Sequence, residues 1–178
     1  NQDENDFCVL NYNDPVLRKF GKTPRCKVIF FSSSEELESG VFLRGDTMII
    51  KENGVETPVC TTKDTSLVGM HNYENIMAAI AMTHAMRVPL DTIRQGIKEF
   101  TAVEHRIEFV TEKNGVKYYN DSKGTNPDAA IKAVCAMPSP TILIGGGYDK
   151  KSSYDEWVAT FEGRVKELLL IGKTKYDI

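Results

Sequence analysis

The sequence predicts an α/β protein in two parts, and three observations support this class. Its 178 residues, 41% hydrophobic and 26% charged, fall in the ordinary range of globular domains. Up to about Thr101, short apolar segments alternate with turns before two helical segments. After Glu104, strands and helices alternate with short links, which is typical of a parallel sheet covered by helices. We therefore place a domain boundary at residues 101–104.

The first part is expected to open with a strand, helix, strand unit. The apolar segments Phe7–Leu10 and Cys26–Phe31 are the expected strands. Between them, Asp14-Pro15 and Gly21 carry the start and stop signals of a short helix.

A hairpin and two helices are expected to follow. Thr47–Lys51 and Val55–Cys60 flank Asn53-Gly54, which can supply the positive φ angles of a tight turn. The segment Asn72–Met86 is rich in Ala and Met and has no Gly or Pro inside, and Leu90–Phe100 has apolar residues at helical spacing. Both segments therefore predict helices.

The second part is expected to begin with another hairpin, Ile107–Thr111 and Val116–Asn120, around Asn114-Gly115. Helices and strands then alternate: Asp128–Met137, Thr141–Ile144, Tyr154–Phe161 and Val165–Ile171. An inner parallel strand needs neighbours on both sides, yet only Gly172–Ile178 follows the last strand. We therefore expect this chain to be a fragment of a longer protein.

Composition argues against several kinds of partner. The net charge of −3 is spread along the chain without a run of Lys and Arg, so nucleic acid is not expected. No apolar run approaches the roughly 20 residues of a membrane helix, and no export signal precedes the first strand. The cysteines have no metal-binding spacing and are expected to be reduced thiols in a cytoplasmic protein: Cys8, Cys26, Cys60 and Cys135.

The densest polar segment is Asn120–Pro127, between a predicted strand and a predicted helix. Ligands of open parallel sheets collect beyond the carboxyl ends of strands, and a helix start adds free N–H groups for anions. Asp121 can accept from ribose hydroxyls, Lys123 can hold a carboxylate or phosphate, and Thr125 can give one hydrogen bond. Alternatively, this is a capping loop in which Asn126 or Asp128 satisfies helix N–H groups and Lys123 lies in solvent. The spacing leaves both interpretations open.

Gly145-Gly146-Gly147 follows another apolar strand and precedes Asp149-Lys150. Three glycines allow a ligand to approach the backbone closely, and the following charges lie at the same sheet edge. The alternative is an ordinary turn between a strand and a helix.

Two further segments are candidates for nucleotide binding. Asn72 and Asn75 can present two amides from one helix face to a nucleobase; alternatively, Asn72 caps the helix and Asn75 faces water. Arg106 has the planar fork that suits oxyanions, whereas His105 beside it reads as a structural histidine.

One resemblance to a phosphate-binding loop fails. Gly172-Lys173-Thr174 ends like a P-loop, but the first glycine of that motif would fall on Glu167. A nucleotide enzyme containing this segment would carry its P-loop elsewhere.

Taken in order, the motifs resemble the Mur ligase family. They are His71-Asn72-x-x-Asn75, Glu104-His105-Arg106-Ile107-Glu108, Asn120–Pro127 and Gly146–Lys150. Asp121-Ser122-Lys123-x-Thr125-Asn126 is most similar to the family member that adds D-glutamate, although Gly124 stands where that member often has alanine.

This resemblance implies three domains in the whole protein. Residues 1–102 would be the latter part of the central ATP-binding domain, and 103–178 the first part of a Rossmann-like C-terminal domain with a parallel sheet. The P-loop, the metal ligands and a modified lysine would lie before Asn1. The implied fold is thus α/β, with one partial ATPase-type domain and one partial Rossmann-like domain.

The resemblance also implies a reaction and its site. ATP, with Mg²⁺, would phosphorylate the carboxylate of UDP-N-acetylmuramoyl-L-alanine, and D-glutamate would attack the acyl phosphate. The enzyme would be cytoplasmic and monomeric. Asn72 and Asn75 would contact adenine, and Arg106 and Asp121 would contact the nucleotide. D-glutamate would be bound by Lys123, Thr125 and Lys150. Lys123 and Arg106 would be the catalytic residues. An extra Lys151 leaves it open which lysine meets the substrate.

Two alternatives to this function remain from the sequence. The chain can be a stand-alone module that binds a nucleotide or a small anion. It can also belong to a ligase of the same family with a different amino acid.

Overall fold

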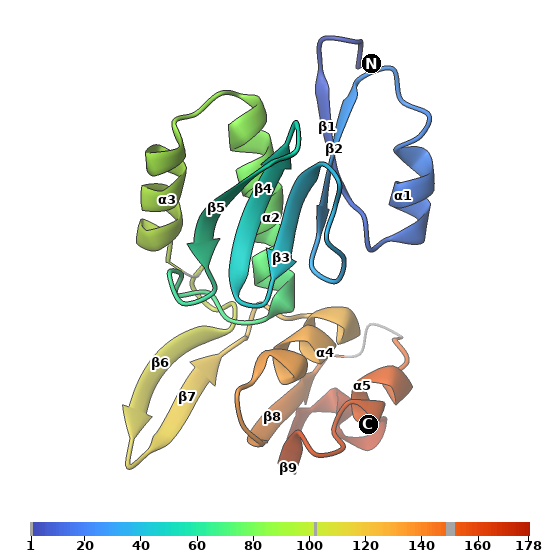
Figure 1. The fold of residues 1–178 in the computed structure, drawn as a ribbon. Coiled ribbons are helices and arrows are strands. Elements are labelled where there is room, and N and C mark those ends of the chain that lie inside the picture. The colour runs from blue at the N-terminus through green and yellow to red at the C-terminus, as the bar shows by residue number, and fades with distance from the viewer. Residues whose placement is uncertain (1, 102, 149–151) are drawn as a thin grey trace. The chain divides into compact units, whose positions relative to one another are not determined.

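The computed structural model describes residues 2–101, 103–148 and 152–178. The chain divides into two compact units, Asn1–Thr101 and Ala102–Ile178, and each is described by itself (Figure 1). Both units combine strands with helices, and parallel strands occur in each. This agrees with the predicted α/β class.

The first unit contains a five-stranded sheet in the order β1-β2-β3-β4-β5. β1, β2 and β3 are parallel neighbours, whereas β3, β4 and β5 are antiparallel. The strands are β1 (Phe7–Asn11), β2 (Lys27–Ser32), β3 (Gly40–Arg44), β4 (Thr47–Glu52) and β5 (Val55–Thr61).

The predicted strand, helix, strand unit is confirmed. Helix α1 (Pro15–Phe20) connects the parallel strands β1 and β2. The Oδ1 atom of Asp14 accepts from the N–H groups of Val16 at 2.7 Å and Leu17 at 3.0 Å. The carboxylate therefore satisfies two N–H groups that the first turn leaves open.

Strand β3 was not predicted from the sequence. Its apolar stretch is only Val41-Phe42-Leu43, between acidic residues and a glycine turn. Tertiary partners define it: Val41 pairs with Ile50 in β4 and also with Phe31 in β2. The Phe42 side chain is fully buried. This short segment thus becomes a central strand because it pairs with β2 on one side and with β4 on the other.

Two helices cover this sheet. Helix α2 (Met70–Ala85) lies across one sheet face and buries Ile76, Met77, Ile80 and Ala81 there (Figure 1). Helix α3 (Leu90–Glu99) packs beside β5, where the Arg94 guanidinium donates to two β5 carbonyls, Val59 O at 3.0 Å and Pro58 O at 2.7 Å.

The second unit consists of a hairpin followed by a parallel strand pair with helices. Strands β8 and β9 are parallel, as predicted, and Trp157 of α5 is buried. Helix α4 begins one residue earlier than predicted, and α5 is shorter at both ends. The elements are β6 (Glu108–Lys113), β7 (Val116–Asn120), α4 (Pro127–Ala136), β8 (Thr141–Gly147), α5 (Asp155–Ala159), β9 (Val165–Gly172) and the 3-10 turn η1 (Lys173–Tyr176).

The cysteines differ in exposure, which gives a first prediction. Burial, together with the nearby Asp64 carboxylate, raises the pKa of the Cys60 thiol to about 11, whereas Cys135 on α4 is exposed. Because this pKa is about three units above pH 8, only about one Cys60 thiol in a thousand would be ionised at that pH. The thiolate is the form that reacts with iodoacetamide. We therefore expect iodoacetamide to label Cys135 much faster than Cys60, with Cys60 labelling rising as the pH approaches 11.

Peptide mass spectrometry of the folded chain measures both labelling rates. Labelling in denaturant provides the control, because there the two thiols should react alike. Equal rates in the folded chain would contradict the buried position of Cys60.

Candidate functional site

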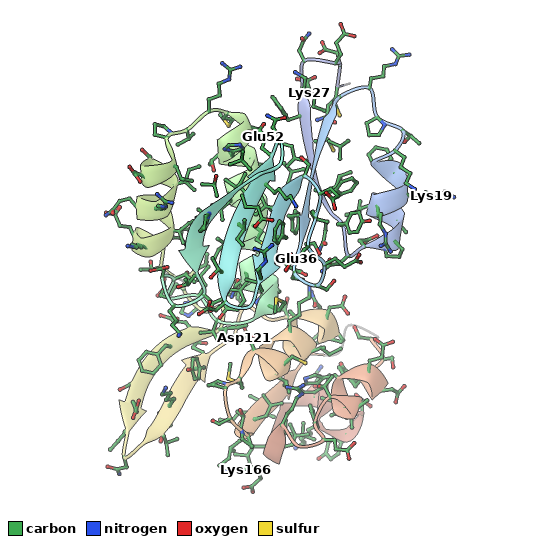
Figure 2. All side chains as sticks on the ribbon, viewed as in Figure 1. Lys19, Lys27, Glu36, Glu52, Asp121 and Lys166 are labelled. Carbon is green, nitrogen blue, oxygen red and sulfur yellow. The ribbon has the colours of Figure 1, made fainter. Side chains whose placement is uncertain are left out.

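The loop between β7 and α4 has a defined backbone, and Figure 2 marks Asp121 at its start. The Oδ1 atom of Asp121 accepts from Ile107 N at 3.0 Å, and its carbonyl accepts from Gly124 N at 2.8 Å. Lys123 N donates to His105 O at 3.0 Å. These bonds fix the loop against residues 105–107, so sequence motifs 14 or more residues apart come together.

Gly124 is part of this geometry. A Cβ atom placed there would run into the Asp121 carboxylate, whose Oδ2 atom would be its nearest neighbour. Glycine at this position therefore lets the Asp121 side chain fold back over the loop. From the sequence alone, Gly124 was only a departure from the alanine that the D-glutamate-adding family member often has.

The capping interpretation holds for one residue of the loop. Asn126 is the N-cap of α4 and accepts from Ala129 N at 2.8 Å. Lys123 and Thr125, in contrast, have exposed side chains. The Lys123 side chain makes no ion pair with residues in the described ranges. Capping accounts for Asn126 and leaves the lysine available to a ligand.

The structure contradicts one expectation for the position of this loop. We expected it to lie beyond the carboxyl end of a strand in the parallel sheet. β7 instead pairs antiparallel with β6 in a separate two-stranded sheet, and β8 pairs with β9. The loop is positioned by the end of this hairpin, by the start of α4 and by its bonds to residues 105–107.

The segment His105–Ile107 has a strained backbone. His105 has a φ of 67° and Ile107 a φ of 46°, values that side chains with a Cβ atom rarely adopt. Ile107 is buried, whereas Arg106 between them is exposed. The strained turn thus presents the Arg106 side chain to solvent beside the Asp121 loop.

Two residues that contact this segment had no role assigned from the sequence. Asn120 Nδ2 lies 2.8 Å from His105 Nδ1, and Glu108 Oε2 accepts from His105 N at 2.8 Å. Both residues lie inside the quoted motifs, but their spacing gave no signal because the contacts depend on the strained turn.

The three glycines at positions 145–147 differ in how much space surrounds them. Gly146 has a φ of 116°, and a Cβ atom there would collide with Ile171 O of β9. At Gly145 a Cβ would lie 2.7 Å from the Trp157 ring, whereas Gly147 has open space around it. Two of the three glycines therefore serve packing within the unit. Asp149, Lys150 and Lys151 lie outside the described residues.

A depression of about 300 Å³ opens at the start of α4. Its lining is polar and acidic, with two carboxylates and no cation among the residues that the structure describes there: Pro127, Asp128, Ser152, Ser153 and Glu156. An anionic ligand in this depression would therefore need a cation from outside that lining.

The two asparagines of α2 lie in different environments. Asn72 is buried and its Nδ2 donates to Val68 O at 2.8 Å, whereas Asn75 is exposed. The α2 N-cap is Gly69, so Asn72 is not the predicted cap. The amide of Asn72 has a structural partner, and Asn75 is the one open to a ligand.

The remaining sequence candidates add no site. Gly172-Lys173-Thr174 leads from β9 into the 3-10 turn, where Thr174 is buried, unlike the exposed phosphate cradle of a P-loop. Within residues 2–101, 103–148 and 152–178, no group of three or more His, Cys, Asp or Glu side chains can hold a metal ion. No helix among those residues is both long and apolar enough to cross a membrane.

These features define an α/β protein whose second unit carries a candidate anion-binding loop. Residues 105–177, which contain that loop, match the family model described as Mur ligase, glutamate ligase domain. The chain is 49% identical over 178 residues to the UDP-N-acetylmuramoylalanine–D-glutamate ligases of Lachnoclostridium phytofermentans and Lachnospira eligens. It is 43% identical over 178 residues to that of Clostridioides difficile. The chain belongs to the Mur ligase family.

The alignments include all of this chain but only part of each relative. They cover 100% of the chain and 39% or 40% of those three ligases. The chain therefore spans about two fifths of the length of the curated relatives it matches.

Solved structures support the fold. A UDP-N-acetylmuramoylalanyl-D-glutamyl-2,6-diaminopimelate–D-alanyl-D-alanyl ligase from Acinetobacter baumannii has a TM-score of 0.67 at 16% identity, covering 94% of this chain and 39% of that one. The MurF ligase from Thermotoga maritima in complex with ADP has a TM-score of 0.61 at 17% identity, covering 97% and 45%. At this identity the likeness establishes the α/β fold alone.

Proposed function

We propose that this chain is part of an ATP-dependent, ADP-forming ligase that joins D-glutamate to UDP-N-acetylmuramoyl-L-alanine in peptidoglycan synthesis. The observation that carries the proposal is the 49% identity, along all 178 residues, to relatives named as D-glutamate ligases. The exposed Lys123 in a loop of fixed backbone supports it, since the substrates are anionic.

The two units would have separate tasks. Residues 1–102 would form the latter part of the central ATP-binding domain, and residues 103–178 the first part of the C-terminal Rossmann-like domain. The family match over residues 105–177 supports the second assignment.

The reaction would proceed in two steps. A carboxylate oxygen of UDP-N-acetylmuramoyl-L-alanine attacks the γ-phosphorus of ATP and releases ADP. The D-glutamate amine then attacks the acyl carbon and phosphate leaves. Both steps build negative charge on oxygen, so cations stabilise them. Lys123 and Arg106, both exposed, are the cations in this chain that we assign to that role.

Each unit has its own candidate residues for nucleotide contacts. Asn75 is exposed on α2 and would hold adenine, with Asn72 as the second predicted amide, although its Nδ2 already donates to Val68 O. Asp121 would contact ribose with the carboxylate that also accepts from Ile107 N, and Arg106 would reach a phosphate.

D-glutamate would be held by its carboxylates. Lys123 supplies a charge, Thr125 a directional hydrogen bond, and Lys150 or Lys151 a second charge. The acidic depression at the start of α4 makes such cations necessary if the amino acid binds nearby.

Mg²⁺ would neutralise phosphate charge during both steps. The described residues provide no cluster of carboxylates or histidines for the metal, and we assign none of them to it. We further propose that the parent enzyme is cytoplasmic and monomeric.

Assaying the isolated chain beside the ligase that contains it tests this assignment. With ATP and both substrates, we expect ADP from the ligase and none from the chain, which has no P-loop motif. Phosphate release by the chain would contradict the placement of the phosphate-holding loop elsewhere. Calorimetry addresses the alternative of a stand-alone module, because tight nucleotide binding by the isolated chain would favour that module.

A further inference from the structure

Asn120 lies where the hairpin, the Asp121 loop and the strained turn meet. It is the last residue of β7, and its side-chain amide contacts both neighbouring segments. Oδ1 accepts from Ser122 N at 3.1 Å, and Nδ2 lies 2.8 Å from His105 Nδ1. One side chain therefore connects the candidate ligand loop to the histidine beside Arg106.

The bond to Ser122 fixes the orientation of the amide. A backbone N–H only donates, so the atom facing Ser122 N must be the amide oxygen. The amide nitrogen then faces His105, and it too only donates. His105 Nδ1 must accept, which leaves the ring proton on Nε2.

The nearby carboxylates agree with this tautomer. Glu104 Oε1 lies 3.7 Å from His105 Nε2, on the side that carries the proton. Glu108 Oε2 lies 3.6 Å from Nδ1, beyond hydrogen-bond distance, and already accepts from the backbone N–H of His105 at 2.8 Å. The Asn120 amide is thus the group that decides the state of Nδ1.

The same contacts restrain the unusual backbone. His105 and Ile107 both have positive φ, and such strain persists only where surrounding bonds over-determine it. Three bonds join this turn to residues 120–123: Asn120 Nδ2 to His105 Nδ1, Ile107 N to Asp121 Oδ1, and Lys123 N to His105 O.

We infer that Asn120 is a positioning residue that holds His105 as the neutral Nε2–H tautomer and so keeps the Arg106 turn against the Lys123 loop. Its importance for catalysis rests on the proposed function. The tautomer itself does not, because it can be measured without substrate or activity.

Nuclear magnetic resonance of the chain labelled with ¹⁵N in its histidines tests this directly. At about pH 8, above the ordinary histidine pKa, we expect a pyridine-type Nδ1 and a pyrrole-type Nε2 for His105. H105Q assigns the signals by removing one of the three histidines. A pyrrole-type Nδ1 in the unchanged chain would overturn the inference, whether or not the chain proves to be part of a D-glutamate ligase.

The isosteric variant Asn120→Asp separates positioning from general stability. A carboxylate still accepts from Ser122 N, but it cannot donate to His105, so Nδ1 should become protonated and its signal pyrrole-type. Asn126→Asp is the matched control in the same loop, since its side chain caps α4, and it should leave the His105 signals unchanged. Unchanged His105 signals in Asn120→Asp would refute the role of Asn120.

In the ligase that contains this chain, Asn120→Asp should lower kcat/KM for D-glutamate about tenfold, whereas Lys132→Ala on the exposed surface of α4 should not. If the tautomer exchanges but the enzyme uses another amino acid, the proposed substrate is wrong and the positioning contact stands. If the tautomer exchanges but kcat/KM is unchanged, Asn120 does not act in the reaction.

Discussion

Replacing Lys123 with alanine in the ligase that contains this chain should lower kcat/KM for D-glutamate about a hundredfold or more. Such a loss corresponds to roughly 3 kcal/mol, the range for removing one partner of a charge pair that becomes buried on binding. The side chain is exposed and makes no ion pair with described residues, so we expect the loss of its charge to affect the proposed ligand more than the fold. Steady-state kinetics with D-glutamate as the varied substrate measures the effect.

Lys132→Ala is the matched control, because Lys132 is an exposed lysine on the adjoining helix α4. We expect it to change kcat/KM less than about twofold, since removing a solvated charge at the surface costs little. Neither variant should alter the melting temperature appreciably. Similar kinetics for both variants would contradict the role of Lys123.

Replacing Gly146 with alanine should destabilise the second unit by about 3 kcal/mol or more, enough to unfold much of it. The residue has a φ of 116°, and its Cβ atom would meet Ile171 O in the backbone of the neighbouring strand. Neither the conformation nor the strand spacing can adapt cheaply. Urea denaturation followed by Trp157 fluorescence measures the loss, because the single tryptophan lies in this unit.

Gly147→Ala separates strain from collision. Gly147 has a φ of 145° and no neighbour within 4 Å of an added Cβ, so only the backbone strain should cost stability. We expect a loss of about 1 kcal/mol, in the lower range of such strain. Equal losses at the two positions would mean that the contact with Ile171 does not matter.

The sequence predicted correctly those helices and turns that are specified by residues close together in the chain. Asp14 capped α1 as expected. Asn53-Gly54 and Asn114-Gly115 turned their hairpins with positive φ at all four positions. Strand β3 could not be predicted in this way, because its short apolar stretch becomes a strand only between β2 and β4.

The same distinction, between local features and contacts made only in the folded chain, applies to the candidate site. Asn126 was one of two candidate caps in the sequence, and the structure places it before α4. Lys123 and Arg106 are exposed, as long charged side chains usually are. The contact between Asn120 and His105 could not be predicted, since it depends on left-handed backbone at His105 and Ile107. Sequence patterns carry little information about such strain when the residues are not glycine.

The choice of amino acid is the claim on which the proposed function depends most. ADP formation by the ligase containing this chain should be measured with ATP, UDP-N-acetylmuramoyl-L-alanine and one amino acid at a time: D-glutamate, L-glutamate, D-aspartate, L-lysine or D-alanine. We predict that D-glutamate gives a rate at least about tenfold above every other amino acid, since a site built around charge and hydrogen bonds discriminates strongly. A higher rate with any other amino acid, or ADP formation without any amino acid, would contradict the proposed function.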